Sequence, residues 1–284
     1  MQKKFKFTLL LVFVVGSLLW GMWLLYESKL AVLDPKGAIA DAERSLFFTA
    51  TWLMLIVVIP VFVLTIYIIW KYRASNKKAT YSPDWDKSHL IESIWWGVPL
   101  VIVIALGVIT WKSCIELDPF RPLVHENKPL RIQVVALQWK WLFIYPDQNI
   151  ATVNFVHFPE KTPLNFEITA DAPMNSFWIP QLGSQIYAMP GMDSRLHLIA
   201  SEPGTFRGSS ANLSGRGFAG MTFTAKASTQ EEFDQWVASA KASQKVLTFD
   251  EYTQLVEPSE NNPVASYSLK EEDLYQRIIM KYVK

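Results

Sequence analysis

The side chains that commonly do chemistry in proteins are few in this sequence and are spread along it. There is one cysteine, Cys114, and there are four histidines, His89, His125, His157 and His197. A single cysteine excludes an internal disulfide, and the histidines show no i,i+4 pairing or other spacing typical of metal ligands. We interpret Cys114 as a small residue beside an apolar segment, without chemistry of its own. His197 alternates with leucines in a strand pattern, so we expect it to face solvent or a hydrogen-bond partner rather than a metal.

Glycine and serine are concentrated in RGSSANLSGRGFAGMTF, residues 207–223. Strand-like runs flank this stretch, so by itself it predicts a loop that closes a β-hairpin. It contains GRGFAG, residues 215–220, which matches the G-x-G-x-x-G pattern of dinucleotide-binding loops. Such a loop must end a parallel strand and open a helix, whereas here a strand pattern follows. We therefore reject a nucleotide site.

Glu92 is the carboxylate with the most suggestive position. It lies in HLIESIWWGVP, residues 89–99, just before a long apolar run. An acidic residue at a helix start is favoured by the helix dipole and needs no function. Carboxylates within or beside membrane helices, however, often mark proton routes. The residues alone leave both interpretations open.

Three uncharged apolar runs, residues 7–26, 45–70 and 93–111, are each long enough to cross a bilayer as a helix, which takes about 20 residues. Three lysines precede the first run, which fits a signal peptide or a retained helix; without a clear cleavage motif we expect a retained anchor. Residues 71–92 carry five lysines and arginines and residues 27–44 carry three. The positive-inside rule therefore places residues 71–92 and the N-terminus in the cytoplasm, and the chain after the third run outside, in a periplasm-like space.

The rest of the 284-residue chain predicts a separate extramembrane part. Residues 130–225 form short β-branched and aromatic runs separated by proline, glycine and asparagine, which predicts an all-β antiparallel sandwich or barrel. The formal net charge of +1 argues against nucleic-acid binding.

From Ser228 onward the pattern is helical. Capping-box patterns begin at Ser228, Thr248 and Ser268, each followed by glutamate three residues later and then by apolar residues at helical spacing. These predict short amphipathic helices. We expect them to pack on their own domain, with docking on another subunit as the alternative.

Several motifs together carry a family resemblance: HLIESIWWGVP before an apolar helix, QWKW at residues 138–141, PMNSFWIPQLGSQIYAMPG at residues 173–191, and the loop at residues 207–223. In this order and spacing they resemble subunit II of the haem–copper respiratory oxidases, from about residue 33 to the C-terminal arm. The resemblance implies a two-helix membrane hairpin that carries a cupredoxin sandwich on the outer face.

Family members that accept electrons from cytochrome c bind a dinuclear copper through histidine, bridging thiolate and thioether ligands. Here Asn175 replaces the first histidine, Ser210 and Ser214 the two cysteines, Phe218 the second histidine and Asn212 a carboxylate ligand of a nearby magnesium, while Met221 is retained. A hydroxyl cannot supply the bridging thiolate. The resemblance therefore implies no metal and no cofactor in this chain, as in the quinol-oxidising branch typified by the bo-type ubiquinol oxidases.

By the same resemblance, the chain would be the non-catalytic subunit II of a proton-pumping ubiquinol oxidase. Quinol oxidation, the haems and the copper of oxygen reduction would belong to the partner subunit I, and Glu92 would lie at the mouth of the K-pathway for proton uptake. Trp139 and Trp141 match an aromatic patch, which we interpret as sandwich packing and contact with subunit I. The alternatives are a copper-bearing cytochrome c oxidase subunit II, or a membrane-tethered cupredoxin-like assembly or binding protein.

The predicted organisation has four parts in a multi-pass protein of a bacterial inner membrane, with other oxidase subunits and lipid as partners. They are an N-terminal signal-anchor or transmembrane helix (1–26), a transmembrane hairpin (27–112), a periplasmic cupredoxin-like domain without copper ligands (128–226) and a helical arm (228–284).

Overall fold

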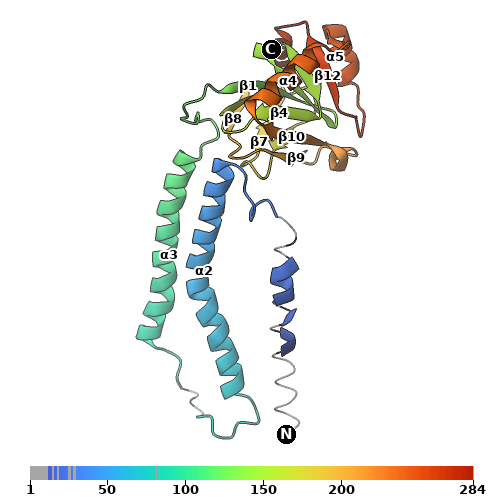
Figure 1. Cartoon of the computed structure of the whole chain (residues 1–284). Coiled ribbons are helices and arrows are strands. Elements are labelled where there is room, and N and C mark those ends of the chain that lie inside the picture. Colours follow the sequence, from blue (N-terminus) through green and yellow to red (C-terminus); the bar gives the residue numbers. More distant parts are fainter. Residues whose placement is uncertain are drawn as a thin grey trace. The chain divides into compact units, whose positions relative to one another are not determined.

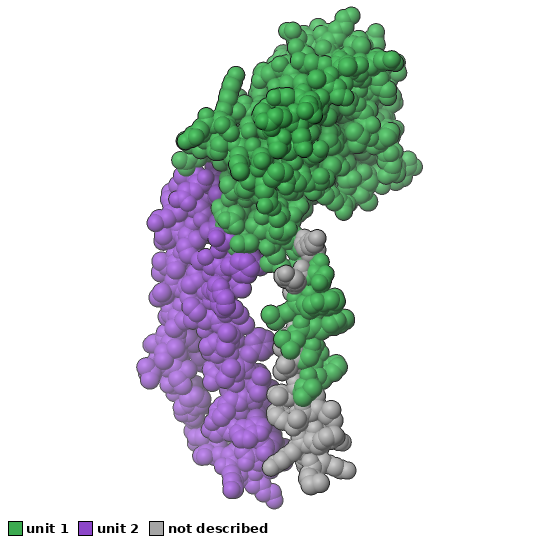
Figure 2. All heavy atoms as spheres, viewed as in Figure 1, with its two compact units in different colours: residues 1–44, 119–284 green, residues 45–118 purple. Residues whose placement is uncertain are grey.

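The computed structural model describes residues 12–283, apart from residues 15, 18, 25, 26, 28, 29, 81 and 83. The chain forms two compact units, Met1–Arg44 with Pro119–Lys284, and Ser45–Asp118 (Figures 1 and 2). The prediction of an N-terminal anchor over residues 1–26 falls largely on residues outside the described set.

Two long helices confirm the second and third apolar runs. They are α2, Ala38–Lys71, and α3, His89–Glu116 (Figure 1). Their most apolar windows have a mean hydropathy of 2.8 and 2.1, and none of the residues in these windows is buried within the chain. In the described part of the chain these are the two helices long and apolar enough to cross a membrane.

The extramembrane domain is a sandwich of two sheets, as predicted (Figure 1). The larger sheet has the order β11 (Val246–Leu247), β12 (Ala265–Leu269), β3 (Ile150–Val153), β2 (Lys140–Tyr145), β1 (Leu130–Leu137), β5 (Leu164–Ala170) and β8 (Ser194–Leu198). The smaller has the order β4 (Phe155–Pro159), β10 (Thr222–Ser228), β9 (Gly204–Ser210), β6 (Asn175–Trp178) and β7 (Ile186–Ala188). The strands are not all antiparallel, because β1 pairs with β5, β10 with β4 and β11 with β12 in parallel.

Aromatic residues fill the space between the sheets. Trp141 of the larger sheet meets Phe177 of the smaller edge to face, with ring centroids 5.4 Å apart, and Phe143 lies 5.1 Å from Phe223. All four are at most 4% exposed. Each such pair contributes about 0.5–1.5 kcal/mol beyond the area it buries. The interpretation of Trp141 as sandwich packing is confirmed.

Asn154 divides one of the β-like runs, ATVNFVHF at residues 151–158, which by itself predicts a single strand. The run at residues 151–158 is divided into β3 and β4, which belong to different sheets. Asn154 lies between them with φ 55°, a left-handed conformation that asparagine tolerates better than most residues. Its buried Oδ1 accepts a hydrogen bond from the Trp141 amide at 2.9 Å. The chain therefore changes sheet at a polar residue within an otherwise β-like run.

The C-terminal arm packs on its own domain. Its helices are α4 (Gln230–Lys241), α5 (Phe249–Val256) and α6 (Leu274–Met280). Tyr252 and Leu274 belong to a second buried cluster that also contains Val135 and Leu142 of the larger sheet. The larger sheet is thus covered on both faces, which explains why β1 and β2 are buried almost continuously rather than alternately.

The predicted helix starts in the arm are right once and wrong twice. Thr248 caps α5 by accepting the Glu251 amide at 3.3 Å, as expected. Thr229, rather than Ser228, caps α4. Ser268 starts no helix, because it lies in β12, which pairs with β3 and so covers an otherwise open sheet edge.

Candidate functional site

The candidate site lies where the loop between β9 and β10 meets the start of β6. Ser210, the last residue of β9, donates from its Oγ to Oδ1 of Asn175 at 2.8 Å. Asn175, the first residue of β6, donates its amide to the Pro173 carbonyl at 2.7 Å. Asn175 and Ser210 are 1% and 6% exposed. Two predicted positions are therefore joined to each other by a buried hydrogen bond between neutral groups.

Asn212 and Ser214 are held by other contacts. The Asn212 amide donates to the Met174 carbonyl at 3.1 Å. The Ser214 carbonyl accepts a hydrogen bond from the Trp139 indole at 3.1 Å, and Ser214 Oγ is buried without a hydrogen-bond partner among the described residues. Ser214 is thus fixed through its backbone carbonyl rather than through its side chain.

Phe218 and Met221 close the loop. Phe218 is half-buried at the start of the short 3-10 helix η2, Phe218–Gly220. Met221 is 1% exposed and belongs to the sandwich core, and its carbonyl accepts the Ser210 amide at 3.0 Å. Met221 is therefore a packing residue of the sandwich core.

The side chains of these six positions do not fit a dinuclear copper centre. They offer amides, hydroxyls, a phenyl ring and a thioether already buried in the core, whereas such a centre needs bridging thiolates and imidazoles. Among the residues that the structure describes, no three histidine, cysteine, aspartate or glutamate side chains are grouped as they would be around a metal ion.

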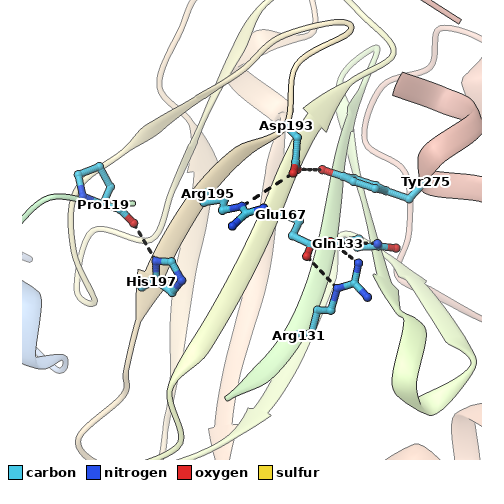
Figure 3. Close-up of polar contacts among 8 residues, drawn as sticks. All are labelled: Pro119, Arg131, Gln133, Glu167, Asp193, Arg195, His197 and Tyr275. Atoms are coloured by element: carbon cyan, nitrogen blue, oxygen red, sulfur yellow. Dashed lines mark hydrogen bonds and ion pairs between the residues drawn. The ribbon is translucent and has the colours of Figure 1, made fainter. Parts of the chain in front are cut away.

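The histidines occupy four separate environments. His197 Nδ1 lies 3.0 Å from the Pro119 carbonyl, which confirms the expected hydrogen-bond partner (Figure 3). His157 Nε2 lies 2.8 Å from Ser228 Oγ, and burial lowers the pKa of this imidazole to about 4, with the charge of Lys226 adding to the effect. His125 Nδ1 accepts the Asn127 amide at 3.1 Å, and His89 Nδ1 lies 3.8 Å from Glu92 Oε2.

A second polar cluster lies on the larger sheet (Figure 3). Arg131 donates to both carboxylate oxygens of Glu167 at 2.8 Å, and Gln133 donates to the same carboxylate at 3.0 Å. Burial raises the pKa of Glu167, but these hydrogen bonds outweigh it and hold the pKa below its ordinary value. Asp193 accepts the Tyr275 hydroxyl at 2.8 Å. These carboxylates are occupied by protein donors, so the cluster stabilises the sheet and the arm.

Glu92 lies in the first turn of α3. Ser88 caps this helix by accepting the Ile91 amide at 3.5 Å, and the Glu92 amide donates to the Ser88 carbonyl at 2.9 Å. The Glu92 side chain is 42% exposed. It therefore combines a capped helix start with a side chain that is partly exposed on this chain, an arrangement compatible with a purely structural or a proton-accepting role.

Comparison with known proteins decides the family. The family models for subunit II of cytochrome c oxidase match residues 27–112 (transmembrane domain) and 148–228 (periplasmic domain), and the model named COX Aromatic Rich Motif matches residues 241–284. The cytochrome bo(3) ubiquinol oxidase subunit 2 of Pseudomonas putida is 56% identical over 262 residues, which cover 92% of this chain and 83% of the relative. The chain belongs to the subunit II family of the haem–copper respiratory oxidases.

A second relative carries a similar description. The ubiquinol oxidase subunit 2 of Acetobacter aceti is 50% identical over 261 residues, covering 91% of this chain and 85% of the relative. The solved periplasmic domain of cytochrome oxidase subunit II from Bradyrhizobium japonicum matches with a TM-score of 0.40 and 23% identity, over 43% of this chain and 97% of that one. As a member of this family, the chain is a membrane protein and one subunit of an oxidase complex.

Sequence patterns did not predict all of the contacts that surround the site in this subunit II. The indole of Trp139 contacts the loop across 75 residues of sequence, and Lys140, 2% exposed, donates to the Glu257 carbonyl at 2.9 Å. A lysine inside the aromatic run QWKW could have signalled a buried amine with a dedicated partner. The identity of that partner is a long-range fact that no local pattern contains.

Proposed function

We propose that this chain is the non-catalytic subunit II of a proton-pumping ubiquinol oxidase. The names of relatives at 56% and 50% identity support this function over that of a cytochrome c oxidase subunit. The observation that carries the proposal is the buried hydrogen bond between Ser210 and Asn175 at two positions where copper-bearing members have ligands. Because no thiolate or imidazole stands there, electrons from a soluble donor would find no metal in this subunit.

In this proposal the chain supports an oxidase core formed by other subunits. Subunit I would hold the haems and copper and oxidise the quinol, and this chain would cover its outer face. Glu92 would receive protons at the cytoplasmic start of α3, because it is a partly exposed carboxylate at the end of a membrane helix.

The proposed topology follows the charge bias of the sequence. Residues 1–26 would anchor the chain and residues 27–112 would form the hairpin in a bacterial inner membrane, with lipid around it. The cupredoxin-like domain, residues 128–226, and the arm, residues 228–284, would lie in the periplasm.

The test is purification of the complex in mild detergent through a tag on this chain. We expect haem-containing partners to copurify, oxygen uptake to be fast with ubiquinol and negligible with reduced cytochrome c, and total copper to match the needs of subunit I alone. An additional stoichiometric copper pair, with activity towards cytochrome c, would establish the copper-bearing alternative. Recovery of the chain without haem proteins would instead favour the assembly or binding protein.

A further inference from the structure

Trp139 contacts the loop at residues 211–220 and has an unfavourable backbone conformation. Trp139 lies in the turn between β1 and β2 with φ 63°, a region that disfavours residues with a Cβ. Its indole donates to the Ser214 carbonyl at 3.1 Å, and the ring packs against Gly217. The contacts of the side chain with the loop account for a tryptophan at a position where glycine or asparagine would be less strained.

The C-terminal arm contacts the same loop beside Trp139. Glu260, in residues 257–262 after α5, accepts a hydrogen bond from Arg216 Nε at 2.7 Å. The Arg216 guanidinium also lies over the Trp139 ring, 5.9 Å from its centroid. Arg216 therefore bridges Trp139 of the sandwich and Glu260 of the arm.

Two glycines of GRGFAG permit this close approach. A Cβ on Gly217 would lie 2.4 Å from the Trp139 ring and 2.8 Å from Cγ of Glu260. A Cβ on Gly220 would lie 2.7 Å from Oδ1 of Asn261. All three distances are shorter than van der Waals contact. A side chain at Gly217 would push against Trp139 and Glu260, whereas the flexible end of the Asn261 side chain can move away from one at Gly220. The middle glycine of the stretch that resembles a nucleotide motif, Gly217, is thus explained by its packing against Trp139 and the arm.

The arm segment is itself anchored to the sandwich. Lys140 Nζ donates to the Glu257 carbonyl at 2.9 Å and also bonds Ser259 Oγ. The Asn154 amide donates to the Asn262 carbonyl at 3.0 Å. Buried groups therefore fix both ends of residues 257–262, while the middle of the segment contacts the loop.

From these contacts we propose that residues 257–262 act as a clamp that holds the loop 211–220 in its folded conformation. In copper-bearing relatives the equivalent loop is tied down by metal ligation, so the arm supplies through protein contacts what copper supplies there. Only this comparison rests on the proposed absence of copper; the clamp itself rests on the contacts of Arg216, Glu260 and Gly217.

The test is hydrogen–deuterium exchange on the whole oxidase complex carrying Gly217→Ala. A clamp requires reciprocal coupling, so a methyl group added to the loop should raise exchange not only in residues 211–220 but also in residues 257–262, by about tenfold. The milder Glu260→Gln should raise exchange in residues 211–220 about twofold, since the ion pair is partly exposed. Leu213→Ala is the matched control, because Leu213 is in the same loop and 77% exposed. It should leave residues 257–262 unchanged.

Unchanged exchange in residues 257–262 of the Gly217→Ala complex would overturn the clamp. If that variant fails to assemble, Glu260→Gln decides alone, and protection of the loop equal to that of the wild type would reject the proposal. Copper content, measured on the same samples, tests the proposed function separately. A complex with an additional copper pair in this chain would contradict the proposed function, yet it could still show the coupling between arm and loop.

Discussion

The hydroxyl of Tyr252 donates to Oδ2 of Asp171 at 2.7 Å, which ties α5 of the arm to the residue that follows β5. Lys281 donates to the same carboxylate at 2.8 Å and Tyr282 adds a third donor, both from the end of the chain. Burial raises the pKa of Asp171, but these hydrogen bonds outweigh it and lower the pKa below its ordinary value. One buried carboxylate thus joins α5 and the residues after α6 to the sandwich.

Asp171→Asn should loosen the arm. The amide cannot accept from three donors as the carboxylate does, and hydrogen bonds to a charged group contribute about 1.5–3 kcal/mol each. We expect the local opening free energy of α5 and α6, measured by hydrogen exchange, to fall by about 2–3 kcal/mol. The control is Arg277→Gln, which breaks an exposed pair with Asp273 and should cost below about 1 kcal/mol. Equal effects of the two substitutions would contradict this role of Asp171.

His157 predicts a pH dependence in the packing of α4. This imidazole is 2% exposed, and its ring lies 4.9 Å from that of Trp236 in α4. Burial lowers its pKa from 6.5 to about 4, so above pH 6.5 both folded and unfolded chains hold it neutral. Between pH 6.5 and about 4 only the unfolded chain takes up the proton, and stability falls as the pH is lowered. Below about pH 4 both states are protonated and the dependence ends.

The measurement for His157 is exchange of the α4 amides at several pH values, corrected for intrinsic rates. We expect a loss of about 3 kcal/mol in local stability across this range in the wild type. His157→Gln should flatten the curve, and the exposed His125→Gln should not. A curve of unchanged slope in His157→Gln would assign the dependence to another group.

Local patterns predicted the parts of the fold that depend on neighbouring residues. The apolar runs predicted α2 and α3, and the β-branched and aromatic runs predicted strands such as β1, β2 and β5. In each case the hydrophobic content of the segment is enough to indicate its secondary structure. β12 escaped prediction because its strand conformation depends on pairing with β3, more than a hundred residues earlier. The site positions were located through the resemblance to the subunit II family. The Ser210–Asn175 bond and the contact of Trp139 with Ser214 arise only when distant strands come together.

A reconstruction of the metal site tests the cupredoxin assignment directly. The combined substitutions Asn175→His, Ser210→Cys, Asn212→Glu, Ser214→Cys and Phe218→His restore the ligand types of the copper-bearing relatives. Because Asn175 and Ser210 are already in hydrogen-bond contact, we expect the variant to bind a coloured copper pair. Absorption spectra and metal analysis provide the measurement, and the same variant without the two cysteines is the control. A folded variant that takes up no copper would count against the predicted ligand positions.

Glu92→Gln tests the proton route. Glutamine keeps the size of the side chain and its place in the first turn of α3, but it cannot accept a proton at neutral pH. We expect oxygen uptake with ubiquinol to fall about tenfold or more, a range typical of the loss of a proton-transfer group, while haem content and subunit composition stay unchanged. Glu116→Gln, at the other end of α3, is the matched control and should retain full turnover. If Glu92→Gln turns over and pumps like the wild type, Glu92 serves only the helix start, where a carboxylate is favourable without any catalytic role.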